Sequence, residues 1–395
     1  MSTELPVNAL RAETPGCSNV THLNNAGAGL MPAPVLRAIT EHLQLEADIG
    51  GYEAADRRAD DLEGAYDSLA TFLNCARDEV AFIENATRAW DMVFYSIPFE
   101  PGDRILTAQA EYVSNYMAYL QMQKRRGVKI DVIPNDECGQ VSVDALKNML
   151  DERVRLVAIT HAPTNGGLLN PAAEIGRVTR DAGVLYLLDA CQSVGQVPID
   201  VEAIGCDMLS ATGRKYLRGP RGTGFLYVRR HLIESLEPPF IDLHAADWTS
   251  INEFRIRSDA RRFENWETNF AGKLGLKAAL DYAAALGIDR IRNRVRALAD
   301  RFRSLLNNLD GVHIADDGVD KSGIVTFHID GIPAVDIKQR LRTSNVNVSV
   351  SDIAIARLDL ETRDLPPLVR ASVHYYNTED ELDRTCELIQ SFLAS

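Results

Sequence analysis

Two polar segments interrupt otherwise apolar sequence in the middle of this 395-residue chain. Asp189 ends the apolar run GVLYLLDA, which is typical of a strand buried on both faces. The segment ATGRKY begins 22 residues after Asp189 and places Thr212, Arg214 and Lys215 before a glycine-rich turn and a further apolar run, GTGFLYV. Because a buried carboxylate needs a cationic partner, these residues predict a polar site where the strands end.

The types of these residues suggest a covalent cofactor site. A lysine at the rim of a buried site has a lowered pKa and becomes a nucleophile toward a carbonyl group. The Thr212 hydroxyl and the Arg214 guanidinium beside it are suited to bind a phosphate. Two simpler interpretations remain open: Asp189 caps a following helix, and Lys215 is a solvated loop residue.

Several ordered motifs give the chain a family resemblance. DACQ, TGRKYLRGPRGTGFLYV and VRASVHYYNTEDE resemble the class V aminotransferases, and the resemblance extends from HLNNAGAG near residue 22 to the C-terminus. It implies a pyridoxal 5'-phosphate (PLP) cofactor held as a Schiff base by Lys215, with Asp189 keeping the pyridine nitrogen protonated. It also implies that Gln192 contacts the phenolic oxygen of PLP and that Thr212 and Arg214 contact its phosphate, although relatives often have histidine at the position of Arg214.

The resemblance implies roles for further positions. Amides at the start of the helix in ENATRAW would face the phosphate, and an aromatic side chain in AEYVSNY would stack on the ring. THAPTNGG, NNAGAG and the C-terminal VRAS would bind the substrate, with an arginine holding its α-carboxylate. RRFENWETN would reach the cofactor phosphate of a second subunit, through Trp266, Glu267 or Thr268. The remaining positions are Ala86, Thr87, Arg88 and Tyr112 for the cofactor and Asn25, Thr164 or Asn165, and Arg370 for the substrate.

The simpler interpretations remain open for these positions as well. Thr87 is equally suited to cap a helix, Arg370 to form a surface ion pair, and Trp266 to pack in the core. His22 and His161 are left without a role. Arg357 is expected to face solvent, although it could bind a second carboxylate of the substrate.

All reactions compatible with these residues begin with removal of the Cα proton by Lys215 from an α-amino acid. We expect an aminotransferase or a carbon–sulfur lyase that works by β-elimination. The alternatives are an epimerase of the isopenicillin N type and, less favoured, a cysteine desulfurase or selenocysteine lyase. Desulfurases need a nucleophilic cysteine in the segment before Arg370, and VNVSVSDIAIARLDLETRDLPPLVR contains none.

Two other classes of protein are disfavoured. A non-catalytic cofactor sensor would not need Lys215, Asp189 and Arg370 together. A dinucleotide-dependent dehydrogenase would need a GxGxxG turn after the first strand, and that strand leads instead into ENATRAW.

The alternation of apolar runs with helical patterns from about residue 79 to 230 predicts an α/β fold with a mostly parallel sheet between helices. The resemblance implies that this sheet is of the seven-stranded type. The resemblance implies the type I PLP fold. We expect an N-terminal arm (1–20), a large PLP-binding domain (21–270, with 21–50 near the small domain) and a smaller α+β domain (271–395). The latter would begin with one long helix, from GKLGLKAALDYAAALG into IDRIRNRVRALADRFRSLLNNL.

The composition of the chain disfavours several classes of binding partner. The net charge of −14 disfavours nucleic acid and anionic membranes, and no apolar stretch is long enough for a membrane span. The six cysteines form no CxxC pair, so neither a metal site nor a disulfide framework is expected. We expect a cytoplasmic homodimer with a shared active site and an amino-acid substrate.

Overall fold

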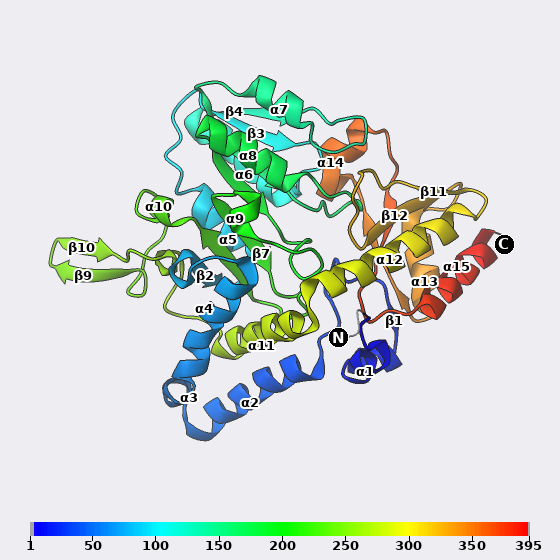
Figure 1. Ribbon diagram of the computed structural model, residues 1–395, viewed down its shortest axis with the longest axis horizontal. Helices are drawn as coiled ribbons and strands as arrows, with labels where there is room; N and C mark the ends of the chain where they lie inside the picture. Colours follow the sequence, from blue (N-terminus) through cyan, green and yellow to red (C-terminus); the bar gives the residue numbers. More distant parts are fainter. Residues whose placement is uncertain (1–3, 394–395) are drawn as a thin grey trace.

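The computed structural model describes residues 4–393, and its largest element is a seven-stranded sheet between helices (Figure 1). The strand order is β2-β8-β7-β6-β5-β3-β4; β8 runs antiparallel to both of its neighbours, and the other pairs are parallel. This confirms the predicted α/β class with a mostly parallel sheet. The strands are β2 (Val80–Ile83), β3 (Arg104–Ala108), β4 (Lys129–Ile133), β5 (Val154–Thr160), β6 (Leu185–Asp189), β7 (Met208–Thr212) and β8 (Gly224–Val228).

The central strands are buried along most of their length, which explains their continuous apolar runs. Helices cover both faces, so apolar side chains of each strand pack above and below the sheet. These helices are α5 (Ala86–Phe94), α6 (Val113–Arg126), α7 (Val143–Met149), α8 (Ala172–Ala182), α9 (Val201–Ile204) and α10 (Arg230–Ile233).

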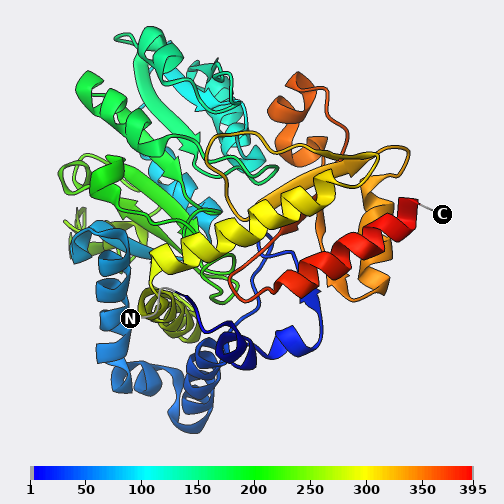
Figure 2. The ribbon, with the colours of Figure 1, turned by 45° about the vertical axis from the view of Figure 1, so that its right-hand side comes forward.

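The helix predicted after residue 270 is in fact two helices, and the prediction of one continuous helix was wrong. Gly287 separates α11 (Phe270–Leu286) from α12 (Ile288–Asn307) with a φ of +85°, a conformation that glycine adopts without steric cost. α11 packs against α2 (Ala33–Ile49) and α4 (Ala59–Leu73). α12 instead extends toward the C-terminal sheet (Figure 2).

The C-terminal part is an antiparallel four-stranded sheet with helices, in the order β11-β12-β15-β14. β1 (Thr21–His22) pairs with β13 (Val346–Asn347), so the start of the chain lies beside this part. The domain boundary predicted at residues 270 and 271 stays a prediction. The other elements here are β11 (Val312–Ile314), β12 (Ile324–Ile329), α13 (Ala334–Thr343), β14 (Ser349–Ser351), α14 (Ile353–Thr362), β15 (Leu368–Ser372) and α15 (Glu379–Leu393).

Several elements had no sequence signal strong enough to predict them. β7 has the short sequence MLSAT, in which Ser210 and Thr212 interrupt the apolar run. β9 (Ala246–Ser250) and β10 (Glu253–Ile256) form an exposed hairpin that projects from the molecule (Figure 1). The others are α1 (Val7–Ala12), α3 (Gly51–Arg57) and three short 3-10 turns, η1 (Pro15–Ser18), η2 (Arg77–Glu79) and η3 (Ala260–Phe263).

Residues 4–393 contain neither a candidate membrane-spanning helix nor a candidate metal-binding cluster. No helix in residues 4–393 is long and apolar enough to cross a membrane. The same residues contain no group of three or more His, Cys, Asp and Glu side chains placed to hold a metal ion.

Candidate active site

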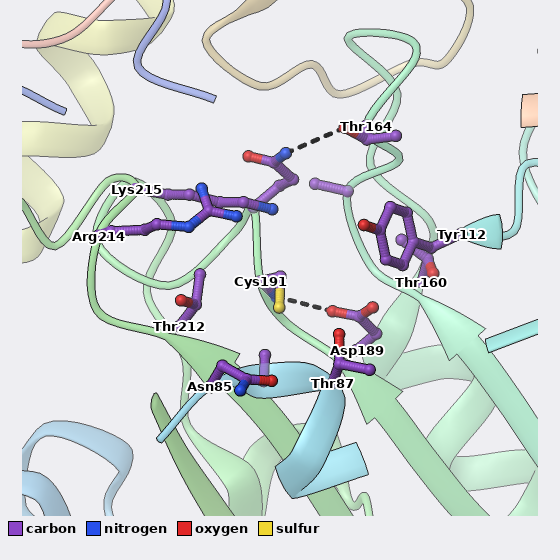
Figure 3. Close-up of a pocket in the computed structure, with 13 residues that line it drawn as sticks. Asn85, Thr87, Tyr112, Thr160, Thr164, Asp189, Cys191, Thr212, Arg214 and Lys215 are labelled. Carbon is purple, nitrogen blue, oxygen red and sulfur yellow. Dashed lines mark hydrogen bonds between the residues drawn. The ribbon is translucent and has the colours of Figure 1, made fainter. Parts of the chain in front are cut away.

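A cavity lies where β5, β6 and β7 end, at the carboxyl edge of the sheet (Figure 3). Ligands bind at this edge in open α/β sheets, because the loops that follow the strands converge there. The cavity brings together most of the predicted cofactor residues with one predicted substrate residue. It is lined by Asn85, Ala86, Thr87, Tyr112, Thr160, Ala162, Thr164, Asp189, Cys191, Gln192, Thr212, Arg214 and Lys215.

Lys215 is held by the loop that follows β7. The N–H of Gly29 donates to the carbonyl oxygen of Arg214 at 2.8 Å, and a Cβ at Gly29 would lie 2.6 Å from the carbonyl oxygen of Lys215. Only glycine therefore allows the NNAGAG segment to approach this closely. Three residues later, the buried guanidinium of Arg218 donates to Thr14 and Tyr375 and fixes the loop to both ends of the chain.

The surroundings of Lys215 favour its neutral amine. Burial lowers the pKa of Lys215, and the nearby Arg214 and Arg370 guanidinium groups lower it further, against the opposing effect of Cys191 and Asp189. In Figure 3 the Lys215 and Arg214 side chains lie beside each other along one wall. A neutral amine is the form that attacks a carbonyl and accepts a proton.

Asp189 is the last residue of β6 and is only 5% exposed. One carboxylate oxygen accepts from the backbone N–H of Cys191 at 2.9 Å, and the other accepts from Nδ2 of Asn115 at 3.0 Å. The carboxylate is thus fixed from two sides while it still lines the cavity. This is the geometry needed to hold a proton on a ligand nitrogen.

The start of α5 forms one end of the cavity, with the backbone geometry suited to a phosphate. Asn85 caps the helix by accepting from the N–H of Arg88, so Thr87 is not the cap, and Ala86 and Thr87 line the cavity at the positive end of the helix dipole. Thr212 and Arg214 lie on the facing wall. The side chain of Arg88 is placed outside the cavity, where it pairs with Glu84.

Arg370 and Thr164 form a linked pair on the substrate side. Nη1 of Arg370 donates to the hydroxyl of Thr164 at 2.6 Å and to its carbonyl oxygen at 3.0 Å. Nε2 of Gln192 also donates to the Thr164 hydroxyl, at 3.3 Å. Burial lowers the pKa of Arg370 to about 10, so the guanidinium remains charged at neutral pH.

Two other predicted substrate residues point elsewhere. Nδ2 of Asn165 donates to Asp359 of α14 at 2.7 Å, so Thr164 rather than Asn165 faces the cavity. Asn25 is fully buried outside the cavity, where its amide donates to the carbonyl oxygens of His22 and Ser372. The amide oxygen of Asn25 accepts from the Tyr376 hydroxyl, so the contacts of this side chain are to the protein itself.

Tyr112 lines the cavity as predicted, and its ring stands across from Lys215 in Figure 3. Neither histidine left without a role lines the cavity. Burial lowers the pKa of His161 to about 4, and burial also lowers the pKa of His22, whose Nε2 contacts the carbonyl oxygen of Ala28. Arg357 is exposed and pairs with Glu361 one turn away, as expected of a solvent-facing arginine.

The segment with Trp266, Glu267 and Thr268 lies apart from the Lys215 cavity. Trp266 is 48% exposed, and Glu267 and Thr268 line a separate depression together with Thr223 and Lys273. The segment therefore does not line the cavity of its own chain, and the predicted contact with a second subunit stays a prediction.

Sequence reasoning missed six residues at or beneath the cavity. Asn115 and Glu111 flank Tyr112 within AEYVSNY, four residues apart, and this spacing around a helix start was the available signal. Asn85, Thr160, Ala162 and Cys191 line the cavity itself. They lie within the motifs ENATRAW, THAPTNGG and DACQ, but no role was predicted for these individual side chains.

The residues present fit PLP. Oε1 of Gln192 and Nε of Arg370 are buried without a hydrogen-bond partner, and each is of the type expected to contact the cofactor or its substrate. An amine, a carboxylate, an aromatic ring and a helix N-terminus surround one cavity, which matches the imine carbon, ring nitrogen, ring face and phosphate of PLP.

Comparison with known proteins gives the family directly. The model of the family described as "Aminotransferase class-V" matches residues 21–385. The chain belongs to this family. It is a PLP-dependent enzyme, as the resemblance implied.

Two relatives of this class-V enzyme are both named as probable cysteine desulfurases. A "Probable cysteine desulfurase" from Methanothermobacter thermautotrophicus is 32% identical over 387 residues, which cover 96% of both chains. A "Probable cysteine desulfurase 2" from Mycobacterium leprae is 31% identical over 97% of this chain and 95% of its own.

Solved structures share its fold. The apo structure of a cysteine desulfurase from Thermococcus onnurineus aligns with a TM-score of 0.93 at 24% identity, over 100% of this chain and 99% of that one. A cystine C–S lyase, solved with its reaction product cysteine persulfide, aligns with a TM-score of 0.86 at 24% identity, over 95% of this chain and 98% of that one.

Proposed function

We propose that this class-V enzyme is a carbon–sulfur lyase that acts on cysteine or a cysteine derivative by β-elimination. The observation that carries the proposal is the coexistence of a complete Lys215–Asp189–Arg370 site with a thiol-free segment where desulfurases need their cysteine. The names of the relatives support a sulfur-containing amino acid as the substrate.

Three groups of residues have separate roles in this reaction: they bind the substrate carboxylate, remove the Cα proton and keep the ring nitrogen protonated. Arg370 and Thr164 bind the α-carboxylate and orient the Cα–H bond, since a guanidinium offers a planar fork of donors. Lys215 takes the Cα proton, because its buried amine is favoured in the neutral form. Asp189 holds the proton at the ring nitrogen. PLP, when bound, supplies the electron sink that makes the Cα proton acidic.

The reaction balances without an oxidant. The bond between Cβ and sulfur breaks, and sulfur leaves with the electron pair of that bond and a proton. Cysteine and one water molecule give pyruvate, ammonia and hydrogen sulfide. A disulfide substrate such as cystine gives cysteine persulfide in place of hydrogen sulfide.

The segment before Arg370 supports direct release of sulfur. α14 lies against the THAPTNGG loop through the hydrogen bond from Asn165 to Asp359, yet residues 346–369 contain no cysteine. Cys191 is the one thiol that lines the cavity, and burial together with the neighbouring Asp189 raises its pKa far above neutral. A thiol held in its protonated form is a poor nucleophile.

A cysteine desulfurase is the second candidate, because relatives carry that name. It would transfer sulfur to a protein thiol and release alanine instead of pyruvate. Transamination and epimerisation, which also begin at Cα, need no sulfur at all and are distinguished by their products.

Product analysis tests the proposal. With cysteine or cystine and no keto-acid acceptor, the holoenzyme is expected to form pyruvate and ammonia in equal amounts. Pyruvate is measured with lactate dehydrogenase and ammonia by a colorimetric assay, both after the reaction has been quenched, so that no acceptor is added. Alanine as the main product would instead establish desulfurase chemistry. A keto acid that appears only with an acceptor would establish transamination, and racemised substrate alone would establish epimerisation.

We also propose that the enzyme is a homodimer with a shared active site. Glu267 and Thr268 line a depression that is separate from the cavity of their own chain, which leaves them free to contact a second subunit. Exposed apolar side chains at Trp248, Phe254 and Trp266 support an interface on this side of the molecule.

A further inference from the structure

A second carboxyl group, that of Glu111, lies beneath the active site. Glu111 follows β3, directly before the start of α6, and is 5% exposed. It does not line the cavity. It contacts Tyr112 and Thr160, which line the cavity, and Asn115, one helical turn further along α6.

Five donor groups point at the two oxygens of Glu111. Oε1 accepts from the Tyr112 backbone N–H at 2.7 Å, from Nδ2 of Asn115 at 3.0 Å and from the Thr160 hydroxyl at 2.5 Å. Oε2 accepts from the hydroxyls of Thr107 at 2.7 Å and Tyr119 at 3.2 Å. These hydrogen bonds favour the ionised carboxylate and oppose the effect of its burial.

Asn115 joins this carboxyl group to Asp189. Nδ2 of Asn115 lies 3.0 Å from Oε1 of Glu111 and 3.0 Å from Oδ2 of Asp189, so its two hydrogens bridge the two acid groups. The amide is 3% exposed, and both of its hydrogens are used. The orientation of Asp189 therefore depends on Glu111.

Three parts of the cavity wall meet at Glu111. Tyr112 contacts Glu111 through its backbone N–H, and Thr160 contacts it through its hydroxyl. Asp189 is joined to Glu111 through Asn115, and all three of Tyr112, Thr160 and Asp189 line the cavity. Burial raises the pKa of Glu111, while the hydrogen bonds from Thr160 and Thr107 act in the opposite direction. A negative charge behind Asp189 adds to the negative potential at the ring nitrogen, and this potential stabilises the protonated, positively charged ring.

We infer that Glu111 is a positioning residue that acts through Asn115 to fix Asp189 and to keep the cofactor's ring nitrogen protonated. This inference rests on the proposed placement of that nitrogen at Asp189. Glu111 does not touch the cofactor or the substrate, and its effect reaches the reaction through the two bridging hydrogens.

The Glu111→Gln variant separates charge from geometry. The glutamine oxygen can accept from Tyr112, Asn115 and Thr160, and its amide can donate to the hydroxyls of Thr107 and Tyr119. The variant therefore keeps the hydrogen-bond pattern and removes the charge. Asn115→Leu breaks the bridge while it leaves four of the donors to Glu111 in place.

The test uses holoenzyme reconstituted with PLP that carries an isotopic label at the ring nitrogen. In the wild type we expect the nitrogen NMR shift of a protonated ring. In Glu111→Gln the shift should move toward that of the neutral ring, and exchange of the substrate Cα proton with deuterated solvent should slow by about tenfold, which corresponds to one pKa unit at the ring nitrogen. Asn115→Leu should move the shift in the same direction.

Tyr186→Phe is the matched control. Tyr186 lies three residues before Asp189 on β6, and its buried hydroxyl has no hydrogen-bond partner, so its loss should leave the shift unchanged. An unchanged shift and exchange rate in folded Glu111→Gln would overturn the inference, and an unchanged shift in Asn115→Leu would do so if Glu111→Gln fails to fold. An unprotonated ring in the wild type would instead contradict the placement of Asp189.

Discussion

Replacement of Lys215 by alanine is expected to abolish covalent PLP binding and to lower the rate of Cα-proton exchange by about 10³-fold or more, since both nucleophile and base are lost. After borohydride reduction, peptide mass spectrometry of the wild type should place the phosphopyridoxyl group on Lys215 and on no other lysine. The rate at which the wild-type apoprotein captures PLP should rise with pH. It should level off below the ordinary lysine pKa of about 10.4, because burial lowers the pKa of Lys215.

Two variants make this result specific. Lys215→Arg keeps a long basic side chain at this position but cannot form an imine, so it should fail in the same way as Lys215→Ala. Lys147→Ala removes an exposed lysine that pairs with Asp144 and should behave as the wild type. If Lys215→Ala still carries PLP on a reducible imine at another lysine and exchanges the Cα proton at the wild-type rate, the assignment fails.

Replacement of Arg370 by leucine is expected to lower kcat/KM for cysteine by about 10²- to 10³-fold, because truncating one partner of a buried charged contact costs about 3–4 kcal/mol. The loss should appear chiefly in KM, measured by steady-state kinetics. The amount of PLP bound at Lys215 should not change, since Arg370 contacts Thr164 and does not line the cofactor cavity.

Cysteamine, which lacks the α-carboxylate, distinguishes recognition from support of the fold. The wild type should exchange the proton beside the nitrogen of cysteamine far more slowly than the Cα proton of cysteine, and Arg370→Leu should lose most of this preference. Arg357→Leu, which removes an exposed arginine paired with Glu361, is the matched control. An equal loss for both compounds would show that Arg370 only supports the structure.

The sequence was sufficient to predict the sheet and the groups at its edge, because their chemistry is local. Asp189 and Lys215 follow strands, and strands of a parallel sheet carry their loops to the same edge. The break at Gly287 was missed because the apolar pattern continues through it on both sides. A positive φ at one residue is not visible in such a pattern.

The contacts that the sequence could not provide depend on side-chain direction. Thr164 and Asn165 are adjacent and both polar, yet one faces the cavity and the other reaches Asp359, 194 residues away. Asn25 lies in a segment that approaches Lys215, but its amide points to the C-terminal strand. The link from Glu111 to Asp189 likewise joins the loop after β3 to the end of β6, through Asn115 of α6.

The central claim is that sulfur leaves the substrate without passing through a thiol of the protein. Intact-protein mass spectrometry of the holoenzyme, quenched during the first turnover with cysteine, measures this directly. We expect no gain of a sulfur atom on any of the six cysteines, in the wild type and in Cys191→Ala alike, while pyruvate accumulates in both. A persulfide that forms within the first turnover on a cysteine, with alanine released in equal amount, would contradict the account.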